Sequence, residues 1–298
     1  MAERCAEASL RVGEPLAGSA AEATRWLAVE EAGAWAPKIF DSPGLGPLAQ
    51  RLRAWDGADG DLRVQLIRRR GGRATKRRRV FVVDAAAGRV WAHRLDDEGL
   101  LALDLEAAFA GQTGEPFDRP LHLVCTHGKR DDCCALRGIP VHRALADAAA
   151  TLPEAERPEV WQTSHLGGHR FAATLVTLPS GVCLGRVDAD EAGDLLAAGG
   201  LHRLDRVRGR CQWPKAAQVA EVQLRERVGL DAELTLQGVE TRPEGWWVRF
   251  ATGTMDDGVP AGALHEVEVR ANMVDTVQPK SCGDEPVAVP RLLAKVRP

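Results

Sequence analysis

Two stretches of the chain show the same succession of apolar and polar patterns. In each, a strand-like run precedes a helical repeat, a second strand, a hairpin around a glycine-containing turn and a second helix. In the first stretch these segments are, in order, 26–30, 47–55, 61–69, 78–95 and 100–111. In the second they are 121–128, 139–152, 159–165, 169–187 and 188–200. The hairpins correspond most closely, VFVVDAAAGRVWAHRL against ATLVTLPSGVCLGRV.

This order of elements is that of a thioredoxin-like lobe. We therefore expect an α/β (α+β) fold with two degenerate thioredoxin-like lobes side by side. A chance match of the order stays open, because strands and helices alternate in many α/β proteins. Pro140 is expected in the first turn of its helix, where a missing N–H is tolerated. The expected parts are an N-terminal arm (1–23), a first lobe (24–115), a second lobe (116–212) and a C-terminal helix with an antiparallel meander (213–298).

The composition narrows the class of protein. The 298 residues suffice for two modest domains, and 45% apolar with 27% charged residues is ordinary for a soluble globular chain. A net charge of −3 argues against a nucleic-acid binder. No apolar run approaches the roughly 20 residues of a membrane span. The first residues also lack the basic and apolar regions of a secretory signal. We expect a cytoplasmic protein that binds neither nucleic acid nor membrane.

Cysteine and histidine gather in two short phrases. CTHGKRDDCC (125–134) holds three thiols and a histidine, and WQTSHLGGHRFA (161–172) holds His165 and His169. Seven cysteines fit a cytoplasmic disulfide framework poorly, so metal or redox chemistry is favoured. The two glycines between the histidines argue for a loop rather than a helix. Each phrase follows a strand, so neighbouring strands would bring two thiolates and two imidazoles together. That set suits zinc or an iron–sulfur cluster.

The motifs CTHGKRDDCCALRG, WQTSHLGGHRFA and LPSGVCLGR, in this order, resemble the sucrase/ferredoxin-like family, whose members are similar to thioredoxin-like [2Fe–2S] ferredoxins. The similarity runs from GEPLAGSA near the start to KSCGDEP near the end. In the matching branch, cysteines spaced C-x8-C and histidines spaced H-x3-H hold the cluster. The resemblance thus implies one [2Fe–2S] cluster held by Cys125, Cys134, His165 and His169. No carboxylate pair suggests a glycosidase site, so the word sucrase has no support in the sequence.

The implied function is one-electron transfer. Two histidine ligands in place of thiolates remove negative charge and, by comparison with Rieske centres, raise the reduction potential from about −400 mV to roughly −150 to +300 mV. The second ring nitrogen of a histidine ligand can carry a proton, so the potential should fall as pH rises. The first lobe should lack a cluster, because VEEAG and IRRRGG contain neither Cys nor His. The sequence favours a one-electron carrier over a stand-alone enzyme without deciding between them.

Three other interpretations stay open. The four ligands could form a structural zinc site in a binding module with no redox role. The vicinal pair Cys133–Cys134 could act as a thiol–disulfide switch, although the familiar C-x-x-C is missing. Cys125 with His127 could belong to a Rieske-type site, although no C-x-x-H follows downstream.

Several residues near these motifs receive a structural interpretation. His127 is expected to stabilise its loop, and Cys133 is expected to pack beside the site. Cys183 and Cys211 are expected at buried apolar positions. Cys282, in KSCGDEP, either covers the cluster or is a spare thiol.

The strongest charge run is RRRGGRATKRRR (68–79). It is interpreted either as a solvated hairpin loop or as a docking patch for an acidic redox partner, a reductase or an electron acceptor. No aromatic residues interleave the run, so stacking on nucleic acid is not indicated.

Overall fold

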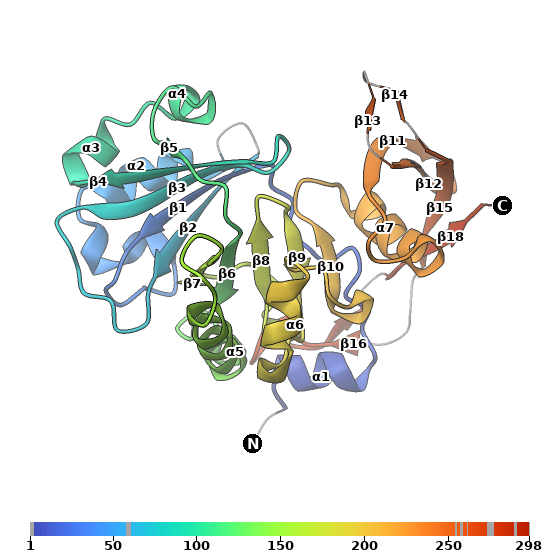
Figure 1. Cartoon of the computed structure of the whole chain (residues 1–298). Helices are drawn as coiled ribbons and strands as arrows, with labels where there is room; N and C mark the ends of the chain where they lie inside the picture. The colour runs from blue at the N-terminus through green and yellow to red at the C-terminus, as the bar shows by residue number, and fades with distance from the viewer. Residues whose placement is uncertain are drawn as a thin grey trace.

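The structure is a computed structural model, and it describes residues 3–57, 61–253, 255–256, 259–260, 262–272, 277–288 and 291–297. Its largest element is a mixed sheet of ten strands in the order β10-β9-β8-β6-β7-β2-β1-β3-β4-β5 (Figure 1). The strands are β1 (Arg25–Glu30), β2 (Leu62–Arg68), β3 (Arg78–Asp84), β4 (Arg89–Leu95), β5 (Glu115–Pro116), β6 (Leu121–Cys125), β7 (Glu159–Thr163), β8 (Leu175–Leu178), β9 (Val182–Leu184) and β10 (Val207–Arg210).

The two halves of this sheet have the same arrangement. In the first half β1 lies between β2, which is parallel to it, and β3, which is antiparallel, and β4 follows β3. In the second half β6 lies between parallel β7 and antiparallel β8, and β9 follows β8. The halves join through the antiparallel pair β2–β7, where Ile67 lies opposite Thr163. This mixed sheet confirms the expected fold class, whereas the division into domains and the duplicated origin stay predictions.

An apolar layer runs through both halves on one face of the sheet. Trp26 and Phe81 of the first half pack in one cluster with Trp161 of the second, and the same cluster contains Cys125 and Cys134. Each of these side chains is at most 1% exposed. Burying a large apolar side chain contributes roughly 1.5–3 kcal/mol, so the shared aromatic layer ties the halves into one core. The candidate cysteines therefore lie inside that core.

Helices cover the other face of each half (Figure 1). In the second half, Val124 of β6 packs against Val141 and Leu145 of a long helix. None of the described helices has the length and apolar character needed to cross a bilayer. The helices are α1 (Cys5–Arg11), α2 (Leu48–Trp55), α3 (Asp97–Leu101), α4 (Leu105–Phe109), α5 (Asp132–Ala150), α6 (Ala192–Ala197) and α7 (Lys215–Val228).

Helix α5 begins seven residues earlier than the sequence pattern predicts. Asp131 is its N-cap and accepts a hydrogen bond of 2.9 Å from the backbone N–H of Cys133. Pro140 lies inside the helix, so its expected place in the first turn is wrong. The cap outweighs the proline as a start signal, because an N-cap carboxylate satisfies N–H groups that the first turn leaves free. The new start places Cys133 and Cys134 on a helix instead of a loop.

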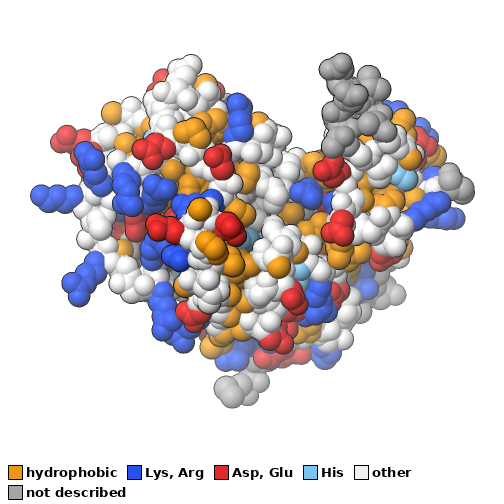
Figure 2. All heavy atoms as spheres, viewed as in Figure 1, with side chains coloured by type: hydrophobic (Ala, Val, Ile, Leu, Met, Phe, Trp, Pro, Cys, Tyr) orange, Lys and Arg blue, Asp and Glu red, His pale blue; other side chains and the backbone are white. Residues whose placement is uncertain are grey.

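The C-terminal part contains a helix and a small antiparallel sheet. Helix α7 packs through Ala220 and Leu224 on Val248 and Phe250 of an antiparallel sheet. At the top of Figure 2 a hollow separates this unit from the large sheet, and residues such as Arg210 help to line it. The order of the small sheet is β11-β12-β15-β18, with β11 (Leu234–Arg242), β12 (Gly245–Thr252), β15 (Leu264–Asn272) and β18 (Arg291–Val296). Two short pairs accompany it, β13 (Met255–Asp256) with β14 (Val259–Pro260) and β16 (Val277–Gln278) with β17 (Val287–Ala288).

The N-terminal arm contains a helix that the sequence pattern does not predict. Helix α1 packs against a short 3-10 helix, η4 (His169–Phe171), and lies beside β16 (Figure 1). Its first residue, Cys5, is fully buried, in one small apolar cluster with Cys133 and Ala172. The start of the chain is therefore docked on the second half of the large sheet, next to the candidate histidines.

Candidate metal centre

The two candidate cysteines come from a strand end and a helix start that pack closely. Cys125 is the last residue of β6, and Cys134 lies in the first turn of α5. The approach depends on Gly138, because a Cβ at that position would lie 2.0 Å from the carbonyl oxygen of Cys125. Both thiols are 1% exposed. The glycine in the middle of α5 thus brings the helix start against the strand end.

The histidine phrase leaves the same edge of the sheet. β6 and β7 are parallel neighbours, with Cys125 opposite Thr163, so the residues that follow both strands emerge side by side, as expected. Gly167 and Gly168 have φ angles of 88° and 70°, which L-residues with side chains rarely adopt. The segment between the histidines is accordingly a tight loop, as the glycines indicate.

Three of the four expected ligands meet in this structure. The Nδ1 atom of His165 lies 3.7 Å from the sulfur of Cys134 and 4.0 Å from that of Cys125. The ligand atoms of these three residues all lie within 4.8 Å of one another. They form a compact group of sulfur and nitrogen donors, in which His165 is the least buried residue.

His169 lies beside this group with its nitrogens turned elsewhere. Its ring centroid is 5.1 Å from that of His165. Its Nδ1 lies 3.3 Å from an oxygen of Asp131 and 3.4 Å from the sulfur of Cys5, and its Nε2 lies 3.1 Å from the hydroxyl of Ser281. To bind a metal with the other three ligands, His169 has to release one of these partners.

The ionisation of the site favours metal binding. A hydrogen bond with the Cys134 thiol lowers the pKa of Cys125 well below its usual range, and the same bond raises the pKa of Cys134. Burial lowers the pKa of His169, which keeps the imidazole neutral. Metals bind thiolates and neutral imidazoles, so the pKa shifts of Cys125 and His169 favour the forms that a metal needs, whereas the shift of Cys134 opposes it.

Two arginines hold the histidine loop by its carbonyl oxygens. Arg63 donates to the carbonyl of His165 at 3.0 Å. Arg208, only 2% exposed, donates to the carbonyl of Gly167 and to the hydroxyl of Ser19, each at 3.0 Å. Burial lowers the pKa of Arg208 to about 10, so it remains charged near neutral pH. The two cations fix the loop and bring positive charge close to the thiols.

His127, Cys183 and Cys211 lie where expected. His127 donates from Nε2 to the carbonyl of Ala36 at 2.9 Å and meets the ring of Trp35 edge-on at 5.8 Å. It therefore stabilises its loop. Cys183 and Cys211 are 6% and 0% exposed, which agrees with buried apolar positions.

Cys133 and Cys282 belong to a different group of side chains. Both lie beside Cys5, away from the thiols of Cys125 and Cys134. The sequence gives no reason to include Cys5, because its neighbours along the chain form no ligand motif. Only the fold brings it to residues more than 120 positions away.

The expected basic docking loop lies at the other end of β7 from the histidines. Arg69 forms an ion pair with Glu159, the first residue of β7, whereas His165 follows its last residue. A hollow of about 360 Å³ lies beside His165 instead, and basic residues line part of it, namely Lys38, Arg53, Arg63 and Arg130. The loop as a docking patch stays a prediction, and the hollow is the basic surface nearer to the site.

Comparison with known proteins agrees with the motifs. The family described as "Sucrase/ferredoxin-like" matches residues 16–209, which are more than half of the chain. The chain belongs to this family. Altered inheritance of mitochondria protein 32 from Eremothecium gossypii is 38% identical over 89 residues, which are 28% of this chain and 27% of that protein. A thioredoxin-like [2Fe–2S] ferredoxin from Aquifex aeolicus aligns with 33% of this chain and 97% of its own at 17% identity and a TM-score of 0.29. Membership of a sucrase/ferredoxin-like family suggests a redox or iron–sulfur role.

Proposed function

We propose that this sucrase/ferredoxin-like protein is a one-electron carrier with one [2Fe–2S] cluster. The observation that carries the proposal is the meeting of Cys125, Cys134 and His165 at one sheet edge, with His169 in the adjoining turn. Thiolates and imidazoles are the donors that such clusters use. Family membership supports the same class of chemistry.

The donor set fits the cluster in number and kind. Cys125 and Cys134 would bind one iron, and His165 and His169 the other. The cluster would supply a reversible one-electron change at a potential raised by its two neutral ligands. The protein excludes water from the thiols, since both are buried in the apolar core. Arg63 and Arg208 partly offset the negative charge of the bound thiolates, because both guanidinium groups contact the loop between the histidines.

One observation favours a structural zinc site as the second candidate. The ligand atoms of Cys125, Cys134 and His165 lie within 4.8 Å of one another, which also suits a single tetrahedral ion. The thiol–disulfide interpretation stays untested; the vicinal pair Cys133–Cys134, on which it draws, is divided between two side-chain groups.

Metal analysis separates the two candidates. We expect protein purified without oxygen to be coloured and to contain about two irons and two sulfides per chain, with a rhombic EPR signal after reduction. Cys134→Ser should lose the colour, and the neighbouring Cys133→Ser should keep it. A colourless protein with one zinc bound by the same residues would establish the structural alternative. Equal loss of iron in the two variants would show that the wrong thiol was chosen.

The potential provides a second test of the histidine ligands. We expect it to fall with rising pH by about 59 mV per unit where one proton accompanies one electron. A redox titration of the wild type, and of His165→Cys/His169→Cys if that variant assembles a cluster, measures this slope. A flat wild-type profile would contradict histidine ligation.

A partner protein is expected to approach at the basic hollow beside His165. Electrons move between proteins only when the two redox groups come close, and His165 is the half-buried member of its group. The four basic residues that line this hollow would attract an acidic surface and speed the encounter. Substituting Arg53 and Arg130 with Glu should slow electron transfer at low salt more than the same change at Arg73 and Arg77 of the loop 68–79. If the changes at Arg73 and Arg77 slowed electron transfer more than those at Arg53 and Arg130, the loop 68–79 would be the docking site.

A further inference from the structure

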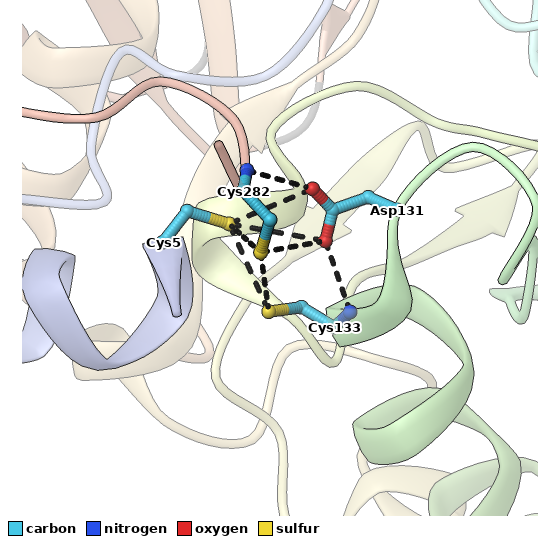
Figure 3. Close-up of side chains that lie close together, drawn as sticks. All are labelled: Cys5, Asp131, Cys133 and Cys282. Carbon is cyan, nitrogen blue, oxygen red and sulfur yellow. Dashed lines mark hydrogen bonds between the residues drawn. The ribbon is translucent and has the colours of Figure 1, made fainter. Parts of the chain in front are cut away.

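Three thiols and one carboxylate converge beside the candidate centre, from three distant parts of the chain. Figure 3 shows Cys5 at the start of α1, Asp131 and Cys133 at the start of α5, and Cys282 in a loop near the C-terminus. Their ligand atoms lie within 4.8 Å of one another. Cys5 and Cys282 are 277 positions apart in the sequence. None of these thiols belongs to the expected cluster ligands.

The three sulfur atoms form a nearly equilateral triangle. The sulfur of Cys5 lies 3.7 Å from that of Cys133 and 3.5 Å from that of Cys282, and the last two lie 3.6 Å apart. The carboxylate of Asp131 closes the group. Its Oδ1 atom lies 3.5 Å from the sulfur of Cys282 and 3.9 Å from that of Cys5.

These distances match the edges of a tetrahedron around one zinc ion. Zn–S bonds of about 2.3 Å place two sulfurs about 3.8 Å apart, and a Zn–O bond of about 2.0 Å places the oxygen about 3.5 Å from each sulfur. The ligands of a four-iron cluster bind different irons and therefore stand farther apart. A disulfide would need two of the sulfurs at about 2.0 Å and would leave the third without a role.

The carboxylate is oriented before any ion arrives. One oxygen of Asp131 accepts from the backbone N–H of Cys133 at 2.9 Å, and the other accepts from that of Cys282 at 3.1 Å. Hydrogen bonds to a ligand from outside the metal's own shell are typical of built sites. The bond from Cys282 also holds the C-terminal loop against the start of α5.

Ordinary packing explains only part of this arrangement. Cys5 and Cys133 pack with Ala6 and Ala172 as a small apolar cluster, and Asp131 caps a helix. Neither role accounts for Cys282. It belongs to an exposed loop, yet its sulfur turns toward two buried sulfurs and a carboxylate.

We propose that Cys5, Cys133 and Cys282 bind one Zn²⁺ as thiolates, with Asp131 as the fourth ligand. Binding releases the three thiol protons, and the four anionic ligands with the dication leave a net charge of −2. The ion ties the first helix and the C-terminal loop to the start of α5. A link between residues so far apart in sequence removes much freedom from the unfolded chain. This site shares no ligand with the proposed cluster, although it adjoins it, because Nδ1 of His169 lies 3.3 Å from an oxygen of Asp131 and 3.4 Å from the sulfur of Cys5.

Metal content of the full chain and its variants tests this site. Protein purified without oxygen should hold one zinc per chain in addition to any iron. Cys5→Ser and Cys282→Ser should each lose the zinc and keep the iron and the visible spectrum. Cys134→Ser should lose the iron and keep the zinc. Cys183→Ser, which removes a thiol outside both groups, is the matched control and should keep both metals.

Three further measurements keep the proposal testable if a serine variant does not fold. In the wild type, these three thiols should resist alkylation until a zinc chelator is added, and mass spectrometry should identify all three together. Co²⁺ in place of zinc should give thiolate charge-transfer bands and the strong visible bands of a tetrahedral site. In Asp131→Asn, which keeps the helix cap, zinc affinity should fall roughly tenfold or more.

Three results would overturn the proposal. The first is a wild-type chain without zinc that also takes up none when zinc is supplied. The second is a disulfide between any two of the three thiols in protein kept free of oxygen. The third is zinc that persists in Cys5→Ser and disappears in Cys134→Ser. That pattern would place the ion among the candidate cluster ligands and would refute the cluster at the same time.

Discussion

Replacing Gly138 with alanine should separate the two candidate cysteines. The added methyl group would lie 2.0 Å from the carbonyl oxygen of Cys125, and carbon and oxygen need about 3.3 Å or more. Helix α5 would therefore have to move about 1.3 Å away from the end of β6. The obstructing atom belongs to the main chain, so a change of side-chain rotamer cannot relieve the clash. This movement would carry Cys134 away from Cys125.

The energetic balance can be estimated from two opposing effects. Alanine in a helix interior is favoured over glycine by about 0.5–1 kcal/mol. Overpacking in a close-packed region costs about 1–3 kcal/mol, and here the displaced atoms include the backbone. We expect a net decrease of about 1–2 kcal/mol in the free energy of unfolding, together with loss of most of the bound iron.

Chemical unfolding of the metal-free protein and iron content of the loaded protein measure these two effects. Gly193→Ala in α6 is the matched control, because no atom lies within 4 Å of the Cβ that it adds. It should leave metal content unchanged and raise stability slightly. If Gly138→Ala behaved like this control, the close approach of α5 to β6 would not be what positions the thiols.

Two other changes test the surroundings of the site. Arg208→Met should lower the free energy of unfolding by roughly 2–4 kcal/mol and weaken metal retention, because the carbonyls of Gly167 and Ser19 lose their buried donor; unchanged unfolding curves would contradict this. Burial alone would raise the pKa of Glu191, but hydrogen bonds from Arg206 and His202 hold it below 4.5. The charged carboxylate therefore stabilises the fold above that pH, and the stabilisation is lost as pH falls. In Glu191→Gln, unfolding measured across acidic pH should lack this loss and show a stability lower by roughly 1.5–3 kcal/mol at neutral pH. A parallel pH profile in both proteins would refute the ion pair's role.

The strands and the histidine loop could be predicted because their signals are local. An apolar run bounded by turns predicts a buried strand wherever it lies in the chain, and this signal predicts both hairpins. The paired glycines at 167 and 168 predict a loop, and their positive φ angles explain why. The pairing of β2 with β7 was not predictable in the same way, because nothing in either strand indicates its partner.

The wrong or missing predictions concern features that are determined by contacts between distant parts of the chain. Pro140 is a local signal for a helix start, but the cap at Asp131 and the packing of α5 on β6 fixed the start earlier. Cys5 stands in a sequence without a motif, and only folding brings it to Cys133. The direction of the His169 ring is likewise set by Asp131 and Ser281, residues from other segments. Its role as an iron ligand stays a prediction.

The antiparallel pairing of β2 with β7 joins the two halves of the large sheet edge to edge within one chain. Two similar units meet edge to edge, as two separate subunits would, but a peptide connection holds them together. Their association therefore cannot be lost on dilution, unlike that of a true homodimer. Because both units belong to one chain, they also need not have the same sequence. Where the second unit ends β6 with Cys125, the first ends β1 with Glu30, followed by Glu31 in an ion pair of 2.7 Å with Arg78. The second unit can thus carry the candidate metal ligands while the first covers its edge strand β7.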